Sequence, residues 1–97
     1  MTVDVRHDEG RSRFVVDLGD GDEAYLDYEE REDGVLDYTS TFVPEEHRGR
    51  GIAEQLVVTA LNWARETGRE VVPTCPYVNH VVQDVHPRFR SLLAPDA

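Results

Sequence analysis

The sequence predicts an α+β fold in which four antiparallel strands precede a strand–helix–strand unit and a final helix, in the order ββββαβα. Three observations lead to this fold class. Apolar and polar residues alternate through most of residues 2–43, as they do in half-buried strands. Residues 51–67 instead carry apolar side chains at a spacing of three and four, the period of an amphipathic helix. A further apolar run at residues 70–75 is followed by a second helical segment that opens with proline.

Turn-forming residues divide the first part of the chain into four strands. The turns are expected at residues 7–10, 19–22 and 32–34. The apolar residues of the successive strands are Val3 and Val5, then Phe14, Val16 and Leu18, then Ala24, Leu26 and Tyr28, then Leu36, Tyr38 and Phe42. In the fourth strand, alternation places Asp37, Thr39 and Thr41 on the face opposite to Leu36, Tyr38 and Phe42. Short connections predict that neighbouring strands pair as an antiparallel meander.

The remaining elements follow from a helical stripe and its boundaries. Pro44 ends the fourth strand, and Gly68 is the expected cap of the helix that spans residues 51–67. The apolar stripe of this helix leaves Glu54 and Gln55 on the solvent face. A right-handed crossover should bring the strand at residues 70–75 parallel to the fourth strand. A second helix is expected from Pro76 to Val85, and His86-Pro87 should end it before a short segment, 88–93, and a frayed tail, 95–97.

Composition limits the function classes. The chain of 97 residues is expected to form one domain, residues 1–97, as a monomer or homodimer. Twenty acidic and ten basic residues give a formal net charge of -10, which disfavours nucleic acid and anionic membranes as partners. All ten basic residues are Arg, so Schiff-base chemistry by a lysine is excluded. The acidic excess indicates adaptation to a salt-rich cytoplasm, and the alternative is an arginine-rich codon bias.

Hydropathy and cysteine content bear on the cellular compartment. No apolar run approaches the roughly 20 residues of a membrane-spanning helix, and the first residues do not resemble a signal peptide. Cys75 is the one cysteine of the chain and cannot form a disulfide within it. These features predict a cytoplasmic protein.

A glycine-containing turn before the long helix is the strongest functional signal. Backbone amides at a helix N-terminus have no intrahelical acceptor and favour an anion. Gly49 and Gly51 lack the Cβ atoms that would keep a phosphate from the backbone, while His47, Arg48 and Arg50 add positive charge in an otherwise acidic chain. The alternative interpretation is an ordinary helix start.

Two segments resemble a known family. The run Arg48-Gly-Arg-Gly-Ile-Ala53 is similar to the pyrophosphate-binding loop of the GNAT N-acetyltransferase superfamily. The run Pro73-Thr-Cys-Pro-Tyr77 resembles a signature of its small, single-domain YjdJ-type group. The resemblance implies a minimal GNAT fold and acetyl-CoA as co-substrate. It also implies that backbone amides from Gly49 through Ile52 to Ala53 wrap the pyrophosphate, that Phe42 and Val43 offer backbone groups to the acyl-pantetheine arm, and that Asn79 contacts the cofactor.

The resemblance also implies catalytic candidates. It places Cys75 beside the acetyl group, either as a nucleophile or as a proton donor to the departing thiolate, whereas the alternative is a buried structural cysteine. Tyr77 is expected to form a wall. His80 is a candidate base for the amine, and a surface or packed histidine is the alternative. His86 is expected to finish the second helix. No ligand spacing among the histidines and Cys75 suggests a metal site.

The resemblance therefore implies transfer of an acetyl group from acetyl-CoA to an amine of an unknown acceptor, directly or through Cys75. Two other classes remain open. The chain could be a non-catalytic module that binds or senses acyl-CoA, or a dimerising interaction domain in which the glycine turn only begins a helix. A positioned base distinguishes the enzyme from the binding module, and saturable binding of acetyl-CoA distinguishes both from the interaction domain.

Overall fold

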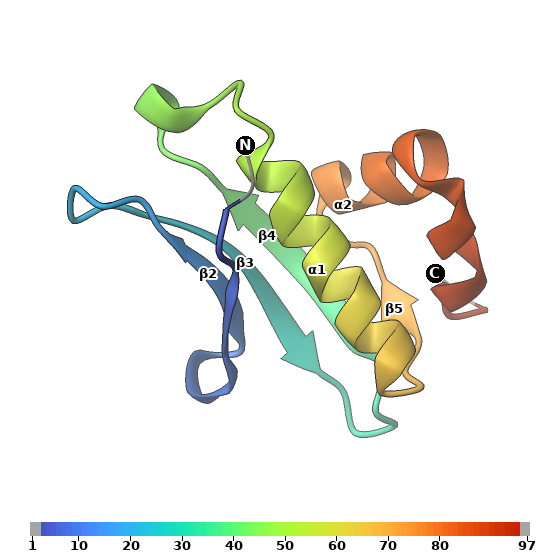
Figure 1. Ribbon diagram of the computed structural model, residues 1–97. Helices are drawn as coiled ribbons and strands as arrows, with labels where there is room; N and C mark the ends of the chain where they lie inside the picture. The colour runs from blue at the N-terminus through green and yellow to red at the C-terminus, as the bar shows by residue number, and fades with distance from the viewer. Residues whose placement is uncertain (1–2, 96–97) are drawn as a thin grey trace.

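A five-stranded sheet, with strands in sequence order, forms the centre of the computed structural model, which describes residues 3–95 (Figure 1). The strands are β1 (Arg6–Asp8), β2 (Arg13–Asp17), β3 (Glu23–Glu30), β4 (Leu36–Phe42) and β5 (Val71–Val72). Strands β1 to β4 pair antiparallel, and β5 lies parallel to β4. The predicted α+β class, the meander and the parallel crossover are therefore confirmed.

The helices follow the order expected from the sequence. The α-helices are α1 (Ile52–Glu66) and α2 (Pro76–His80), and a π-helical segment, η3 (Val81–Val85), continues α2. Short 3-10 segments are η1 (Glu9–Arg11), η2 (Glu45–His47) and η4 (Pro87–Leu92). Within residues 3–95, no helix has the length and apolar character needed to cross a membrane.

Helix α1 covers one face of the sheet, and the core lies between them (Figure 1). The predicted stripe of α1 is buried at Leu56, Val57 and Leu61, each with 0% exposure. The Tyr38 hydroxyl, on β4, donates a hydrogen bond of 2.5 Å to the carbonyl of Ala60. This contact joins the strand that precedes the glycine turn to the helix that follows it.

The first and last strands differ from those predicted. The first strand covers Arg6–Asp8 rather than the region of Val3 and Val5, because the Val3 amide donates to the Gln55 side chain at 2.9 Å instead of to a neighbouring strand. Strand β5 covers only Val71–Val72 of the predicted residues 70–75. Pro73 has no N–H group for a sheet ladder, which explains why pairing stops before it.

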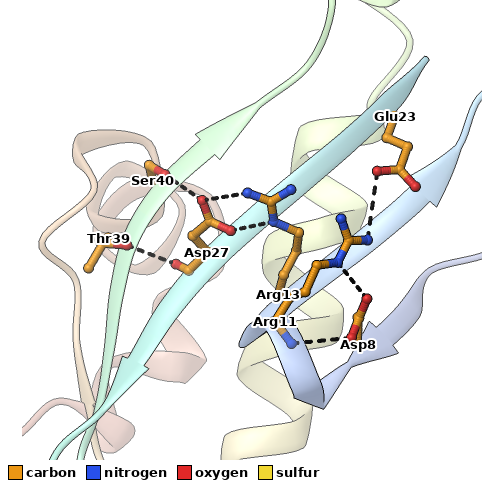
Figure 2. A network of polar contacts seen from close by, with 7 residues as sticks. All are labelled: Asp8, Arg11, Arg13, Glu23, Asp27, Thr39 and Ser40. Carbon is orange, nitrogen blue, oxygen red and sulfur yellow. Dashed lines mark hydrogen bonds and ion pairs between the residues drawn. The ribbon is translucent and has the colours of Figure 1, made fainter.

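A β-bulge in β4 overturns one prediction about the faces of the sheet. Asp27 pairs with Ser40 and Tyr28 pairs with Tyr38, so Thr39 is an extra residue in β4. Its hydroxyl donates to the Asp27 carbonyl at 3.2 Å, as Figure 2 shows. The alternation reverses after the bulge.

The reversal exchanges the sheet faces on which the side chains after Thr39 lie. Thr41 turns toward the core side and Val43 is buried, whereas Phe42 is 42% exposed and packs on Tyr25 with ring centroids 5.4 Å apart. The prediction that placed Phe42 on the face of Leu36 and Tyr38, with Thr41 opposite, is wrong because a bulge shifts the two-residue period by one.

The C-terminal part returns to the sheet. The extent predicted for the second helix is confirmed, but the helix widens at its end, where the His86 amide donates to the Val81 carbonyl at 2.7 Å. Leu93 bridges Val71 in parallel, and the Ala94 amide donates to the Val71 carbonyl at 3.0 Å. Ala94 is consequently buried, and the expected frayed tail from residue 95 lies partly outside the described residues.

Candidate functional site

The turn between β4 and α1 contains two glycines with a left-handed backbone. Gly49 has φ 83° and Gly51, the N-cap of α1, has φ 77°, a left-handed conformation that glycine adopts most easily. The Gln55 amide donates to the Gly51 carbonyl at 3.1 Å and so closes the first turn of α1. The amides of Ile52, Ala53 and Glu54 precede this bond and lie where a helix provides no acceptor. A Cβ atom built at either glycine meets no other atom within 4 Å, so the space above the loop is open.

A cleft of about 280 Å³ lies against this loop. Its lining comes from the end of β4, the loop, the first turn of α1 and the start of α2: Val43, His47, Arg48, Gly49, Gly51, Ile52, Ala53, Glu54 and Tyr77. Seven of the residues predicted to bind the cofactor are therefore brought together in one cleft. The amides and the Arg48 guanidinium suit an anionic group, and Val43 and Ile52 suit an apolar chain.

Two side chains fix the loop to its surroundings. The Arg48 Nε donates to the Val43 carbonyl at 2.9 Å, which holds the loop against the end of β4. The His47 Nε2 lies 3.0 Å from the Asp20 Oδ2, in the turn between β2 and β3. That interaction contributes to the lowered pKa of Asp20. Arg50 makes no hydrogen bond or ion pair with any residue from 3 to 95 and points its charge to solvent.

His47 also belongs to a small cluster at the β2–β3 turn. Ligand atoms of Asp20, Asp22 and His47 lie within 4.8 Å of one another, a grouping that the sequence did not suggest. Both aspartates are exposed, and the His47 imidazole is already engaged with Asp20. The cluster is sufficiently explained as a brace between the hairpin turn and the loop.

Cys75, which is buried, and Thr41, which is half-buried, form a pair at the junction of the strands with α2. The Cys75 Sγ lies 3.6 Å from the Thr41 Oγ1, and either atom can donate. Cys75 is 5% exposed, its amide donates to the Tyr38 carbonyl at 2.9 Å, and it is the N-cap of α2. It does not line the loop cleft, although Val43 and Tyr77, which do, each follow one member of the pair by two positions.

The pairing between β4 and β5 is short at this point. It joins Leu36 to Val71 and Asp37 to Val72, and within the described part of the chain no later residue of β4 has a strand partner in β5. Among the described residues, the hydrogen bond from the Cys75 amide to the Tyr38 carbonyl is the last backbone hydrogen bond on that side of β4. The segment of β4 from Ser40 to Phe42 thus keeps its pairing with β3 alone.

Two cleft residues carry chemistry that sequence reasoning did not assign. Glu54, expected on the solvent face, has its Oε2 2.9 Å from the His86 Nε2, so His86 does more than end the helix. Tyr77 forms part of the wall, and burial, followed by the nearby charge of Glu54, raises the pKa of its hydroxyl. Position 54 lies in the first turn of the helix, where side chains are near the loop. This position is the feature of the sequence that could have identified Glu54 as a cleft residue.

Several predicted site residues lie away from the cleft. The side chain of Phe42 lies on the opposite sheet face. Asn79 and His80 are both exposed on α2, where the His80 Nδ1 is 3.2 Å from the Asp84 carboxylate. Neither residue is among the described residues that line the cleft. The side chain of His80 is therefore not placed to accept a proton from a group bound there.

Comparisons with known proteins agree with these features. Residues 13–92 match the protein family described as GCN5-related N-acetyl-transferase. Protein NATD1 of Gallus gallus is 36% identical over 95 residues, which cover 96% of this chain and 86% of that protein. Protein NATD1 of Homo sapiens is 36% identical with 96% and 84% coverage, and that of Xenopus tropicalis is 34% identical with 97% and 88% coverage. The segment that matches the family contains every residue that lines the loop cleft.

Proposed function

Because the chain belongs to the GCN5-related N-acetyltransferase family, we propose that it is an acetyl-CoA-dependent enzyme that transfers the acetyl group to a primary amine. The observation that carries the proposal is the loop between β4 and α1. Two left-handed glycines and the first-turn amides of α1 border an open cleft there. A diphosphate bound at these amides is favoured by the helix dipole and by the charge of Arg48.

The acyl arm would then extend from the loop toward Thr41 and Cys75. Val43 and Tyr77 lead from the cleft to that pair, and the side of β4 that faces away from β3 leaves backbone groups for an extended chain beyond Tyr38. In this arrangement Phe42 contributes only its backbone, since its side chain faces away. Backbone amides of β4 would polarise the thioester carbonyl.

Two routes are consistent with these residues. In direct transfer, the amine nitrogen attacks the thioester carbon, the carbon–sulfur bond breaks, and the coenzyme A thiolate takes a proton. In the relayed route, the Cys75 sulfur first attacks the thioester, releases coenzyme A and forms an acetylated cysteine. The amine then attacks that second thioester and regenerates Cys75. Thr41 is near enough to Cys75 to orient its thiol in either route.

The charge of the protein bears on the acceptor. A net charge of -10 attracts cations and repels anions at low ionic strength, so we propose a cationic amine as acceptor. High salt would screen this attraction within a few ångströms. The acetyl-accepting nitrogen must lose a proton, and this requires a base or a fraction of free amine at the working pH.

The proposal is tested by incubating the protein with acetyl-CoA and a panel of small amines and N-terminal peptides. Release of free coenzyme A and the mass of the acetylated acceptor are measured, together with the intact mass of the protein. Acetylation of Cys75 that is lost in Cys75→Ser supports the relay, whereas full turnover by Cys75→Ser excludes it. If acetyl-CoA does not bind at all, the proposal is refuted.

A second candidate function is a non-catalytic module that binds or senses acyl-CoA. It is favoured by the position of the candidate bases. His80 lies outside the cleft, and Glu54, the carboxylate among the described residues of its lining, already pairs with His86. Saturable binding of acetyl-CoA without turnover on any amine would select this alternative.

A further inference from the structure

The ten arginines of the chain fall into three groups according to their partners. Five form ion pairs with carboxylates of the same chain: Arg6, Arg11, Arg13, Arg31 and Arg69. Arg48 and Arg50 belong to the loop between β4 and α1, where the proposed diphosphate would neutralise them. The last three, Arg65, Arg88 and Arg90, have no carboxylate partner among residues 3–95, although the chain has twenty acidic residues.

Two of these last arginines meet on one aromatic ring. The Arg88 Cζ lies 4.1 Å and the Arg65 Cζ lies 5.7 Å from the centre of the Phe89 ring. Phe89 is buried, whereas both arginines, named here the arginine pair, are exposed. Arg65 also donates to the neutral amide of Asn62 at 2.7 Å. Stacking on a ring leaves the N–H edge of a guanidinium free, and two neighbouring cations repel each other until an anion binds them.

Neither the loop nor the helix end accounts for the arginine pair. Arg65 lies about 21 Å beyond Gly51 along the axis of α1, at about 1.5 Å per residue, which is too far to serve a diphosphate at the loop. The negative end of the helix dipole favours Arg65 in the last turn of α1. Arg88, however, lies in η4, outside that helix. The pair therefore has room for an anion from another molecule.

The turn between β3 and β4 carries the opposite charge. The Gly34 amide donates to the Arg31 carbonyl at 2.9 Å and closes a turn whose central residues are Glu32 and Asp33. Glu29, Glu32 and Asp33, named here the acidic turn, are exposed and form no ion pair within the described chain. A hollow of about 560 Å³ is lined by Glu29, Glu30, Arg31, Glu32 and Asp33. A guanidinium that entered it would find three carboxylates without a cationic partner.

The arginine pair and the acidic turn lie beside the same end of α1. The Arg69 amide donates to the Ala64 carbonyl at 2.9 Å, directly after the helix, and the Arg69 Nε donates to the Gly34 carbonyl at 3.0 Å. Arg69 also pairs with Glu30. Figure 1 shows the connection between β3 and β4 next to the C-terminal end of α1, with the C-terminal segment beside that helix. Opposite charges thus occupy neighbouring positions at one end of the molecule.

We propose that two copies of this chain form a twofold symmetric dimer, in which the acidic turn of each copy binds the arginine pair of the other. Because both features lie at one end of the molecule, one twofold axis at that end lets the two contacts form together. The carboxylates accept charge-assisted hydrogen bonds from the guanidinium groups. The net charge of -10 on each copy opposes association, but at about 0.15 M salt this repulsion is screened beyond about 8 Å. The proposal does not depend on the proposed function.

The test is sedimentation of the full chain over a range of concentrations at about 0.15 M salt. The wild type should pass from monomer to dimer as the concentration rises. Arg88→Glu and Glu32→Arg should each raise the dissociation constant of the dimer at least about tenfold, because each reverses a charge in both contacts. Arg50→Glu and Glu46→Arg are the matched controls, since they make the same charge changes at exposed residues before the other end of α1. These controls should change the constant by less than about threefold.

A mixture of the two charge reversals tests the pairing of the two features. In a mixed dimer, the reversed turn of one chain faces the reversed arginine position of the other, and the second contact is that of the wild type. Equimolar Arg88→Glu and Glu32→Arg should therefore associate within about threefold of the wild type. Urea unfolding checks that each variant is folded. If Arg88→Glu does not fold, because Arg88 packs on Phe89, Arg65→Glu takes its place.

Each other outcome overturns the dimer. A wild type that stays monomeric at every concentration does so, and if it then binds poly-glutamate in a manner lost in Arg88→Glu, the arginine pair serves a different acidic partner. Assemblies larger than a dimer refute the twofold arrangement, because a head-to-tail contact grows into chains. A dimer that neither reversal weakens is held by another surface. A mixture as weak as either variant alone shows that the acidic turn and the arginine pair do not meet.

Discussion

Replacing Gly51 with aspartate should weaken the binding of coenzyme A at least about tenfold and leave the protein folded. A Cβ atom at this position meets nothing within 4 Å, so the cost to stability comes from φ 77° and should be about 1 kcal/mol or less, since aspartate tolerates left-handed backbone. The new carboxylate would lie at the mouth of the loop. Two charges about 6 Å apart repel by about 0.7 kcal/mol in water and about 2.8 kcal/mol at an effective dielectric constant of 20. A diphosphate with about two charges doubles these values, which corresponds to a loss of at least about tenfold in affinity.

Gly51→Asn is the matched control because it has nearly the same shape and backbone preference but no charge. Affinity for coenzyme A is measured by calorimetry at two salt concentrations, and stability by urea unfolding. Gly51→Asp should bind at least about tenfold more weakly than Gly51→Asn at low salt, and the difference should shrink as salt screens the repulsion. If both variants bind coenzyme A like the wild type, the diphosphate does not lie at this loop. If both variants are unfolded without urea, the glycine is needed for the fold.

Three further predictions concern stability. Tyr38→Phe removes the buried hydrogen bond to the Ala60 carbonyl and should lower the free energy of unfolding by about 1 kcal/mol, which urea denaturation measures; no change would mean that the bond contributes nothing. Burial is the main cause that lowers the pKa of His7 below its ordinary 6.5, against the opposing charges of Glu9 and Asp8, so the unfolded chain binds the proton more readily. Stability should therefore fall as the pH falls below about 6.5, and His7→Gln should flatten that part of the profile of melting temperature against pH. Phe42→Ser, on the half-covered sheet face, should lower stability by less than the roughly 2–5 kcal/mol expected for Leu56→Ala in the core, since Phe42 is 42% exposed.

The order of elements could be predicted because each is encoded by its own short pattern. The stripe of α1 from Ile52 to Ala64 has the helical period, and Gly68, with φ 70°, ends the helix as expected. The loop was equally local, since two glycines between a strand and an apolar helix leave few other arrangements. Tyr77 joined the cleft wall as expected, because the crossover fixes where α2 begins.

Features that depend on pairing between distant segments could not be predicted. Nothing in the residues around Thr39 signals a bulge, because a bulge is a property of the register between β3 and β4. The prediction consequently placed Thr41 and Phe42 on the wrong faces of the sheet. The Glu54–His86 pair joins residues 32 positions apart and requires that η3 pass beside the first turn of α1. No spacing rule for helices or strands contains that information.

The bulge also determines which side chains of β4 face the helices. If β4 continued without the extra residue, Phe42 would point toward the helices in place of Thr41, and Val43 would leave the cleft. A large ring would then occupy the position beside Cys75 that a small hydroxyl side chain now holds.

The extra residue disrupts the ladder to β3, and contacts on the opposite face offset that loss. Thr39 donates to the Asp27 carbonyl, and the Asp27 carboxylate is held by Arg13 at 2.6 Å and by Ser40 at 3.4 Å (Figure 2). The arrangement of Thr41, Cys75 and the cleft wall therefore depends on a polar network on the far side of the sheet. Within the described part of the chain, no hydrogen bond or ion pair joins that network to a residue that lines the loop cleft, and yet the bulge that it supports sets the register with which β4 leads into Val43.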